Sequence, residues 1–217
     1  MKYQNCVSAT FLDRPNRFIA HVELNGKTET VHVKNTGRCR ELLLPGAQVT
    51  LQKQEGPNRK TKYDLISVYK ENLGWVNIDS QVPNKVVAEW LQTQGYDFIK
   101  PEFSYGNSRV DFYMQKNAEQ YLLEVKGCTL EVDGQGYFPD ASSIRAAKHC
   151  RELAEASRRG YHCIIAFVIA MEQVTTVFPN RVTDPDFAAA LEEAANAGVC
   201  ILTLPCAVTA DSICIRS

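Results

Sequence analysis

The chain of 217 residues lacks several features that would assign a protein to a class at once. It has no run of about 18 apolar residues, the length a membrane-spanning helix needs, and its first residues, 1–6, lack the apolar core of a signal peptide. It also has no Gly-rich phosphate loop, no dinucleotide-binding fingerprint, no helix-turn-helix and no zinc-finger spacing. We therefore expect a cytoplasmic globular protein without a membrane anchor and without a sequence-reading DNA motif.

Closely spaced cysteine pairs are also missing, although the chain has eight cysteines. Zinc sites use such pairs, and most of these cysteines stand inside apolar patterns, as Cys163 does. We expect reduced, structural thiols. An alternative that stays open is a nucleophile–base pair formed by Cys128 and His149.

Charge is distributed unevenly, although the net charge is only −1 and the 45% hydrophobic content is ordinary for a globular protein. Residues 1–84 carry twelve Lys and Arg against eight Asp and Glu, whereas residues 85–217 carry twelve against seventeen. A basic first part joined to an acidic second part predicts that the first binds a polyanion and that the second places acids at a metal.

The first 80 or so residues alternate between apolar and polar positions, with glycines at the turns. Many short strands at this spacing indicate a small closed β-barrel. We expect strands at 6–12, 17–24, 28–33, 48–52, 64–70 and 75–78, and one short helix over 38–44.

The pattern changes at Val82-Pro83-Asn84, where Asn84 is a good N-cap for a helix that Gly95 ends. Strands are expected at 96–105, 108–114, 120–130, 161–170 and 199–204, and further helices at 143–159 and 185–197. The order αβββαβαβ predicts a mixed α/β domain over 83–217, after the barrel of 1–82.

Two of the expected strands carry Asp111, Glu124 and Lys126. A hairpin symmetric about Asn117-Ala118 pairs position 111 with position 124, and two opposed carboxylates repel unless a cation lies between them. A site of Asp111 and Glu124, with Lys126 to position water, suits Mg²⁺- or Mn²⁺-dependent phosphodiester hydrolysis. The alternative is a solvated strand face with a Glu–Lys pair.

Other residues are candidates to complete this site. The carbonyl of Val125 is an extra metal ligand, and either Glu89 or Glu102 supplies a further acid, unless each is a solvated carboxylate. One face of the following helix carries Arg145, Lys148, His149 and Glu152. This face either contacts the phosphates or is a solvent-facing stripe.

Basic and polar residues also collect in the turns of the expected barrel, where nucleic-acid backbones are usually bound. We predict DNA binding without strong sequence specificity by this set: Arg14, Arg17, Lys34, Asn35, Arg38, Arg40, Arg59, Lys60 and Lys62.

Several segments together resemble the sugar fermentation stimulation protein A family: 14–18 (RPNRF), 31–38 (VHVKNTGR), 41–47 (ELLLPGA), 59–65 (RKTKYDL), 106–112 (GNSRVDF), 123–130 (LEVKGCTL) and 138–141 (FPDA). The resemblance implies an OB-like barrel joined to a restriction-endonuclease-like domain of the PD-(D/E)xK type, with DNA binding. Asp111, Glu124 and Lys126 would then be the family's acid and ExK residues, and Glu89 the acid of the leading helix.

Three hypotheses follow. The first is a DNA-binding protein whose metal site hydrolyses DNA. The second is a non-enzymatic DNA-binding regulator of sugar metabolism genes that retains a nuclease fold. The third, a sugar-binding or sugar-converting enzyme, has only the family name behind it.

Overall fold

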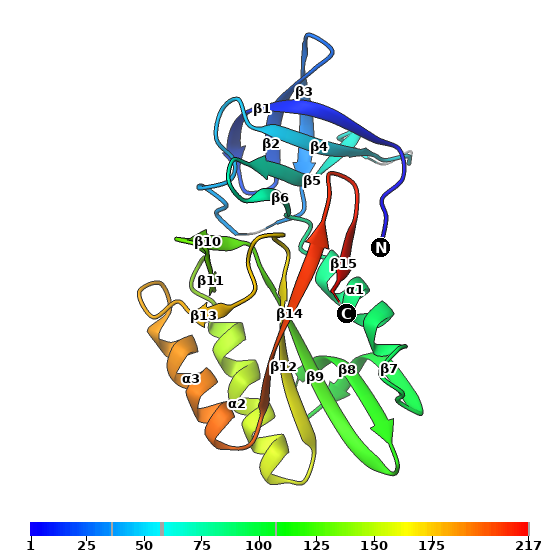
Figure 1. The fold of residues 1–217 in the computed structure, drawn as a ribbon, viewed down its shortest axis with the longest axis vertical. Helices are drawn as coiled ribbons and strands as arrows, with labels where there is room; N and C mark the ends of the chain where they lie inside the picture. Colours follow the sequence, from blue (N-terminus) through cyan, green and yellow to red (C-terminus); the bar gives the residue numbers. More distant parts are fainter. Residues whose placement is uncertain (36, 57–58, 107, 217) are drawn as a thin grey trace.

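The computed structural model describes residues 1–35, 37–56, 59–106 and 108–216. Its first part is a β-barrel whose strands follow the alternation of the sequence, with buried Val, Leu and Phe on the inner positions. The strand order is β3-β2-β1-β4-β5-β6, and β3 also pairs with β5, which closes the barrel (Figure 1). The strands are β1 (Cys6–Asn16), β2 (Ile19–Leu24), β3 (Lys27–Val33), β4 (Gln48–Lys53), β5 (Tyr63–Lys70) and β6 (Gly74–Asn77).

The six predicted barrel strands are confirmed, but the predicted helix over 38–44 is wrong. This segment forms successive turns, and only one bond of α-helical spacing, Leu43 N–H to the Cys39 carbonyl, is present. Cys39 has a positive φ of 46°, which a right-handed helix cannot contain. The N–H groups of Arg38 and Cys39 donate to Asp140, 3.2 Å away, so a residue distant in sequence holds the segment in its turns.

The second part is a six-stranded mixed sheet of order β15-β14-β12-β9-β8-β7. Helices α2 and α3 pack against each other beside β12, whereas α1 contacts β9 and β15 (Figure 1). Its elements are α1 (Val82–Leu91), β7 (Phe98–Tyr105), β8 (Ser108–Lys116), β9 (Glu119–Cys128), α2 (Ile144–Arg158), β12 (His162–Ile169), α3 (Pro185–Asn196), β14 (Cys200–Val208) and β15 (Ile213–Ile215). The predicted order αβββαβαβ is confirmed, and no described helix has the length and apolar character needed to cross a membrane.

The N-cap residues of the three helices follow local sequence rules in two cases. Ser143 caps α2 by accepting the Ala146 N–H, and Asp184 caps α3 in the same way. The predicted cap of α1, Asn84, is wrong, because the helix begins at Val82 with Gln81 at the N-cap position. Pro83 fits this earlier start, since proline is tolerated in the first helical turn.

Sequence patterns missed the shortest strands. A small sheet of order β10-β11-β13 is formed by β10 (Leu130–Val132), β11 (Gln135–Phe138) and β13 (Val177–Pro179). Segments of three or four residues are too short to display a period.

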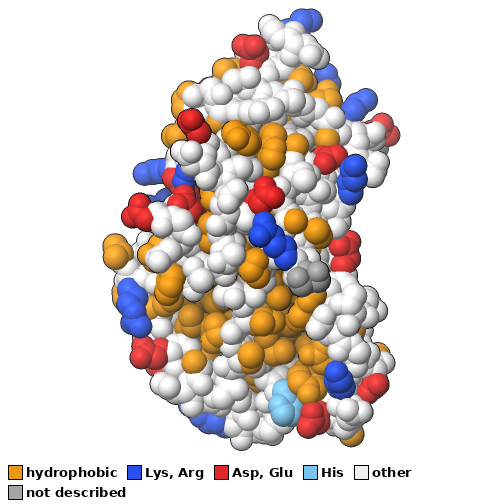
Figure 2. All heavy atoms as spheres, viewed as in Figure 1, with side chains coloured by type: hydrophobic (Ala, Val, Ile, Leu, Met, Phe, Trp, Pro, Cys, Tyr) orange, Lys and Arg blue, Asp and Glu red, His pale blue; other side chains and the backbone are white. Residues whose placement is uncertain are grey.

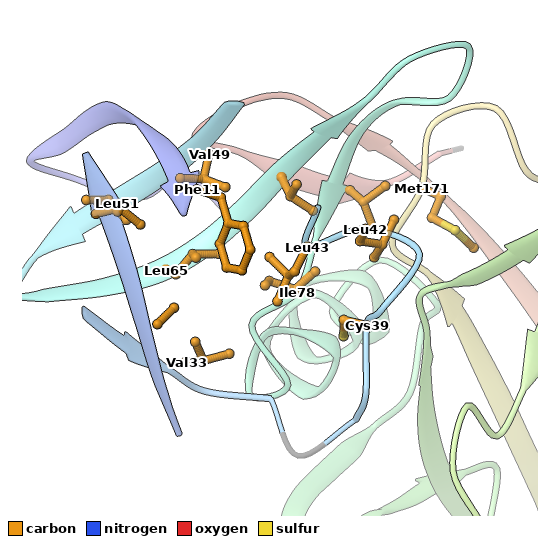
Figure 3. Close-up of a cluster of buried hydrophobic side chains, with 14 of the residues drawn as sticks. Phe11, Val33, Cys39, Leu42, Leu43, Val49, Leu51, Leu65, Ile78 and Met171 are labelled. Atoms are coloured by element: carbon orange, nitrogen blue, oxygen red, sulfur yellow. The ribbon is translucent and has the colours of Figure 1, made fainter. Parts of the chain in front are cut away.

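The two parts share side-chain packing. Met171, from the second part, is fully buried in the barrel's cluster, where it lies beside Leu42 (Figure 3). Tyr3, from the start of the chain, packs in the cluster of α1 and the large sheet. The predicted domain boundary after residue 82 lies next to the start of α1. Apolar side chains of the two parts contact each other across this boundary.

The sheet face shown in Figure 2 is partly open. Hydrophobic side chains gather over the lower half of this view, where β9, β12 and β14 lie in Figure 1. Ile164 of β12 and Leu202 of β14 pack against the cluster of α1 and the large sheet and are only partly buried. The opposite face carries α2 and α3, and this is the face that buries Glu124 against His149.

Candidate functional site

The hairpin of β8 and β9 places Asp111 and Glu124 together. The strands pair from Lys116–Glu119 to Phe112–Leu123, and positive φ angles at Asn117 and Ala118 make the turn. This is the predicted register, which puts position 111 opposite 124. Just beyond the last pair, the Val125 N–H donates to Asp111 Oδ2 at 2.7 Å, so a side chain replaces the ladder at that point.

Glu124 and Lys126 are buried, at 4% and 9% exposure, so the alternative of a solvated strand face is wrong. The Lys126 ammonium donates to Glu124 Oε1 at 2.8 Å, and His149 Nδ1 contacts the same oxygen. The other oxygen, Oε2, is buried and has no hydrogen-bond partner among the described residues. An unpaired carboxylate oxygen in a buried site is costly unless something else satisfies it.

The two carboxyls have opposite pKa shifts. Burial, and then the nearby charge of Glu124, raise the pKa of Asp111 above its usual value. Burial would also raise the pKa of Glu124, but the bonds and charges of His149 and Lys126 hold that pKa below its usual value. The pair therefore carries one firmly ionised carboxylate and one whose ionisation is disfavoured, in part because the first is so close.

A hollow of about 680 Å³ opens beside this pair, and we call it the carboxylate hollow. Its lining joins the hairpin to the start of α1 and the start of α2, and includes Asp111, Glu124, Lys126, Asn84, Lys85 and Arg145. Glu102 also lines it, but this exposed side chain is paired with Arg109 at 2.9 Å. The oxygen-rich lining suits a hard cation such as Mg²⁺ or Mn²⁺.

Glu89 lies elsewhere. Its exposed carboxylate accepts the N-terminal ammonium of Met1 at 2.9 Å, and Glu89 does not line the hollow. Within the described ranges, no group of three or more His, Cys, Asp or Glu side chains is placed to hold a metal. The hollow therefore offers a cation two carboxylates, with backbone oxygen and water to complete its shell.

The predicted basic face of α2 divides among three environments. Arg145 is exposed and lines the hollow, whereas Lys148 points to Glu152, 3.5 Å away. His149 is buried at 7% exposure. Arg145 Nε donates to His149 Nε2 at 3.4 Å, and the other ring nitrogen, Nδ1, faces Glu124. His149 thus orients the Glu124 carboxylate, and its burial keeps it from serving as an open phosphate contact.

Four of the predicted DNA-binding residues of the barrel are used internally. Arg14 donates to four backbone carbonyls, those of Arg17, Asn35, Gly37 and Arg38. The Asn35 amide bonds the Gly37 N–H and the Ile78 carbonyl. Lys34 bridges Asp64 and Asp79, at 3.2 and 3.1 Å, and Arg59 also pairs with Asp64. These four side chains hold the turns in place, and we leave them out of the DNA contacts proposed below.

The remaining basic residues are exposed, and three of them share a second hollow. A hollow of about 1020 Å³, which we call the junction cleft, lies between barrel and second part, and Arg17, Arg38 and Arg40 line it. Lys60 and Lys62 are also exposed but do not line it. Among the described residues, none of these five has a carboxylate within ion-pair distance, so their charges remain available to an anion.

The alternative of a Cys128 nucleophile is wrong. Cys128 is completely buried, its sulfur bonds the carbonyls of Leu130 and Tyr137, and burial raises its pKa to about 12. A thiol with that pKa is protonated at neutral pH and is a poor nucleophile. All eight cysteines are free, as expected for reduced thiols.

Sequence reasoning missed two features of the site. Asn84 donates to Asp111 Oδ1 at 2.7 Å, although its position at the start of a helix suggested a cap. Gly127 allows close packing, because a Cβ there would lie 2.8 Å from Pro83 Cγ. The glycine directly after Lys126 was a visible signal, since glycine inside a strand often marks a close approach.

Two family models match almost the whole chain. The model described as "Sugar fermentation stimulation protein RE domain" matches residues 81–212, and "SfsA N-terminal OB domain" matches residues 12–78. The chain belongs to the sugar fermentation stimulation protein family. The predicted OB-like barrel is thereby confirmed, as is the α/β domain that follows it.

Relatives match this chain over nearly its full length. A "Sugar fermentation stimulation protein homolog" of Desulfitobacterium hafniense is 51% identical, covering 98% of this chain and 94% of the relative. The homolog of Ruminiclostridium cellulolyticum is 47% identical over 96% of this chain and 93% of its own. The solved structure of Pyrococcus furiosus SfsA in complex with Ca²⁺ is 28% identical, with a TM-score of 0.88 over 100% of this chain and 96% of the other.

Proposed function

We propose that this member of the family is a cytoplasmic DNA-binding protein that hydrolyses DNA phosphodiesters at a divalent-metal site in the carboxylate hollow. The observation that carries the proposal is the buried Glu124 Oε2, which has no hydrogen-bond partner among the described residues, beside an Asp111 whose pKa is raised. A cation would satisfy the unpaired oxygen and remove the repulsion between the two carboxylates. The Ca²⁺ bound by the Pyrococcus furiosus relative supports an oxygen-ligand cation site in this fold.

Asp111, Glu124 and the carbonyl of Val125 are the ligands we assign to Mg²⁺ or Mn²⁺. A metal there supplies positive charge that offsets the phosphate and acidifies the attacking water. Asn84 fixes the Asp111 carboxylate, and His149 fixes that of Glu124. Lys126 Nζ, held at 2.8 Å from Glu124 Oε1, positions the water. In hydrolysis the water oxygen forms a bond to phosphorus while the bond from phosphorus to the leaving sugar oxygen breaks. The water loses one proton and the leaving sugar oxygen gains one.

DNA is the polyanion we assign, because the exposed arginines of the junction cleft lie next to this site. Phosphate contacts of this kind position a backbone without reading bases, which fits binding with little sequence preference. Such binding should weaken steeply with salt, since each contact releases counterions.

The test combines metal titration with DNA cleavage. End-labelled single-stranded, duplex and branched DNA is incubated with Mn²⁺ or Mg²⁺ and wild-type protein, Asp111→Asn or Glu89→Ala. Asn keeps the shape of Asp111, and Asn84 can turn its amide to accept where it now donates, so the variant should fold. We expect cleavage by wild type and Glu89→Ala only, and no heat of metal binding in Asp111→Asn.

Cleavage that persists in Asp111→Asn would mean a contaminating nuclease and would sink the assignment. DNA binding without cleavage under every metal condition would overturn hydrolysis and leave the non-enzymatic regulator of sugar metabolism genes. Absence of metal binding at millimolar concentration would remove the metal site itself.

A further inference from the structure

The linings of the two hollows adjoin on the protein surface. Ser80 lines both. Three segments pass from the junction cleft to the carboxylate hollow within a few residues: Pro83 to Asn84 in α1, Gly127 to Lys126 in β9, and Ser143 to Arg145 in α2. A ligand that extends from the cleft along these segments would therefore reach Asp111 and Glu124, and we call the two adjoining hollows together the channel.

The charges along the path are arranged for a polyanion. Arg17, Arg38 and Arg40 line the cleft and Arg145 lines the hollow, and none of them pairs with a described carboxylate. Three acids also line the cleft. Asp79 pairs with Lys34, Asp140 accepts two backbone N–H groups, and Asp13 lies 2.9 Å from His21 Nδ1. The arginines of the cleft lining, with Arg14 included, outnumber these acids, so an entering ligand faces net positive charge.

The dimensions select a single strand over a duplex. The cleft, at about 1020 Å³, has the size of a large ligand pocket, for which about 300–1,000 Å³ is typical. Such a space takes a few stacked nucleotides of one strand. Glu124 is also recessed, with a side chain only 5% exposed, so the scissile phosphate must leave the outline of a duplex to reach it.

Side chains that favour unpaired bases stand along the same path. Tyr137 is half-buried and lines the cleft, where its ring offers aromatic surface on which bases stack without sequence preference. Ile144, between the cleft residue Ser143 and the hollow residue Arg145, is 88% exposed. Apolar side chains that project in this way insert between bases in other nucleic-acid complexes.

We propose that the junction cleft and the carboxylate hollow bind one single strand of DNA, which runs over Arg17, Arg38 and Arg40 and brings a phosphate to Asp111 and Glu124. The proposal rests on the function proposed above and names its substrate class: single strands, overhangs and flaps, with uninterrupted duplex excluded. Ile144 inserts between bases and separates the bound strand from the part of the DNA that stays outside the channel.

The test measures binding apart from cleavage. Fluorescence anisotropy in EDTA compares a labelled strand of about 16 nucleotides, the upper site size of an OB fold, with a hairpin duplex of the same charge. We expect the single strand to bind at least about tenfold more tightly. Arg38→Ala/Arg40→Ala should weaken single-strand binding about tenfold and reduce the slope of log K against log salt by about 1.4, since each phosphate that is no longer neutralised accounts for about 0.7.

The matched control is Lys60→Ala/Lys62→Ala, which removes two charges of the barrel outside the cleft. It should leave both affinity and slope nearly unchanged.

Ile144→Ser tests the projecting apolar side chain and should weaken single-strand binding. Because Ile144 projects into solvent, this change should not alter the melting temperature. Arg40→Glu is a second cleft variant, and both cleft variants are checked for wild-type melting.

The outcomes are distinguishable. Equal or tighter binding of the duplex, or an equal fall in affinity for the two double variants, would overturn the channel even if DNA is cleaved. Single-strand binding that depends on Arg38 and Arg40 supports the channel even where no metal condition gives cleavage, and that result would overturn only the proposed hydrolysis.

Discussion

Asn84 and Asp111 are joined by a hydrogen bond of 2.7 Å that links the start of α1 to β8. The amide of Asn84 donates to Oδ1, while the Val125 N–H donates to Oδ2. Both oxygens are therefore held by neighbours, and the carboxylate has one orientation before any cation arrives. A group that fixes a metal ligand in this way usually matters nearly as much as the ligand.

Asn84→Ala should weaken Mn²⁺ or Mg²⁺ binding about 10- to 100-fold, the range for removal of a supporting hydrogen bond. The fold should persist, because α1 is held mainly by buried residues such as Val86, Val87 and Leu91. Isothermal titration calorimetry gives the affinity, and thermal melting without metal checks the fold.

The matched control is Glu89→Ala on the same helix. Its carboxylate faces the Met1 ammonium, so its removal should leave metal affinity unchanged. A larger fall in affinity for Glu89→Ala than for Asn84→Ala would show that the acid of α1 binds the metal, as the sequence resemblance implied.

His149 should prove to be a positioning residue for Glu124. His149→Ala leaves the buried carboxylate with Lys126 as its remaining side-chain partner among the described residues, and removal of a bond to a charged group costs about 1.5–3 kcal/mol of unfolding free energy. His149→Asn retains a donor of similar reach and should be destabilised less. Urea unfolding measures both variants. DNA affinity should hardly change, and a large fall in DNA binding in a normally stable His149→Ala protein would restore His149 to the DNA contacts.

The sequence predicted the features that depend on local rules. Alternation located the barrel strands, and symmetry of the turn at Asn117 and Ala118 paired positions 111 and 124. The acid–acid–lysine set was therefore recognisable before its surroundings were known.

The surroundings were not predictable, because they depend on partners distant in sequence. Asn84 appeared to be a cap because its acceptor, Asp111, lies 27 residues away. The face of α2 that carries His149 is polar in sequence. Helical periodicity does not reveal that the strand of Glu124 packs against this face. Arg14 and Arg38 were indistinguishable as basic turn residues. Only the fold shows that one binds four carbonyls and the other faces the cleft.

The eight thiols should divide sharply by reactivity. Cys200 and Cys214 are exposed, whereas burial raises the pKa of Cys39, Cys128, Cys163 and Cys206 to about 12 and that of Cys150 to about 11. A disulfide reagent should titrate the exposed pair rapidly in native protein, Cys6 more slowly, and these five only in denaturant. Cys200→Ser/Cys214→Ser removes the fast phase. Rapid modification of Cys128 in native protein would contradict its burial.

Glu41 should destabilise the protein in its ionised form. Its Oε1 is buried without a hydrogen-bond partner among the described residues, and burial, with a further contribution from Asp140, raises the pKa of this carboxyl. A carboxyl with a raised folded-state pKa is most favourable when protonated, so its contribution to stability is full below the unfolded-state pKa and is lost as pH rises through the folded-state value.

Glu41→Gln should therefore raise the free energy of unfolding at neutral pH, by an amount that shrinks toward zero as pH falls to the unfolded-state pKa. Urea unfolding of wild type and variant over that range measures it. Glu71→Gln removes the same charge from an exposed position of the barrel and should stay within about 0.5 kcal/mol of wild type, as surface substitutions usually do. A Glu41→Gln variant less stable than wild type at neutral pH would mean that the buried carboxylate has a partner that stabilises its charge.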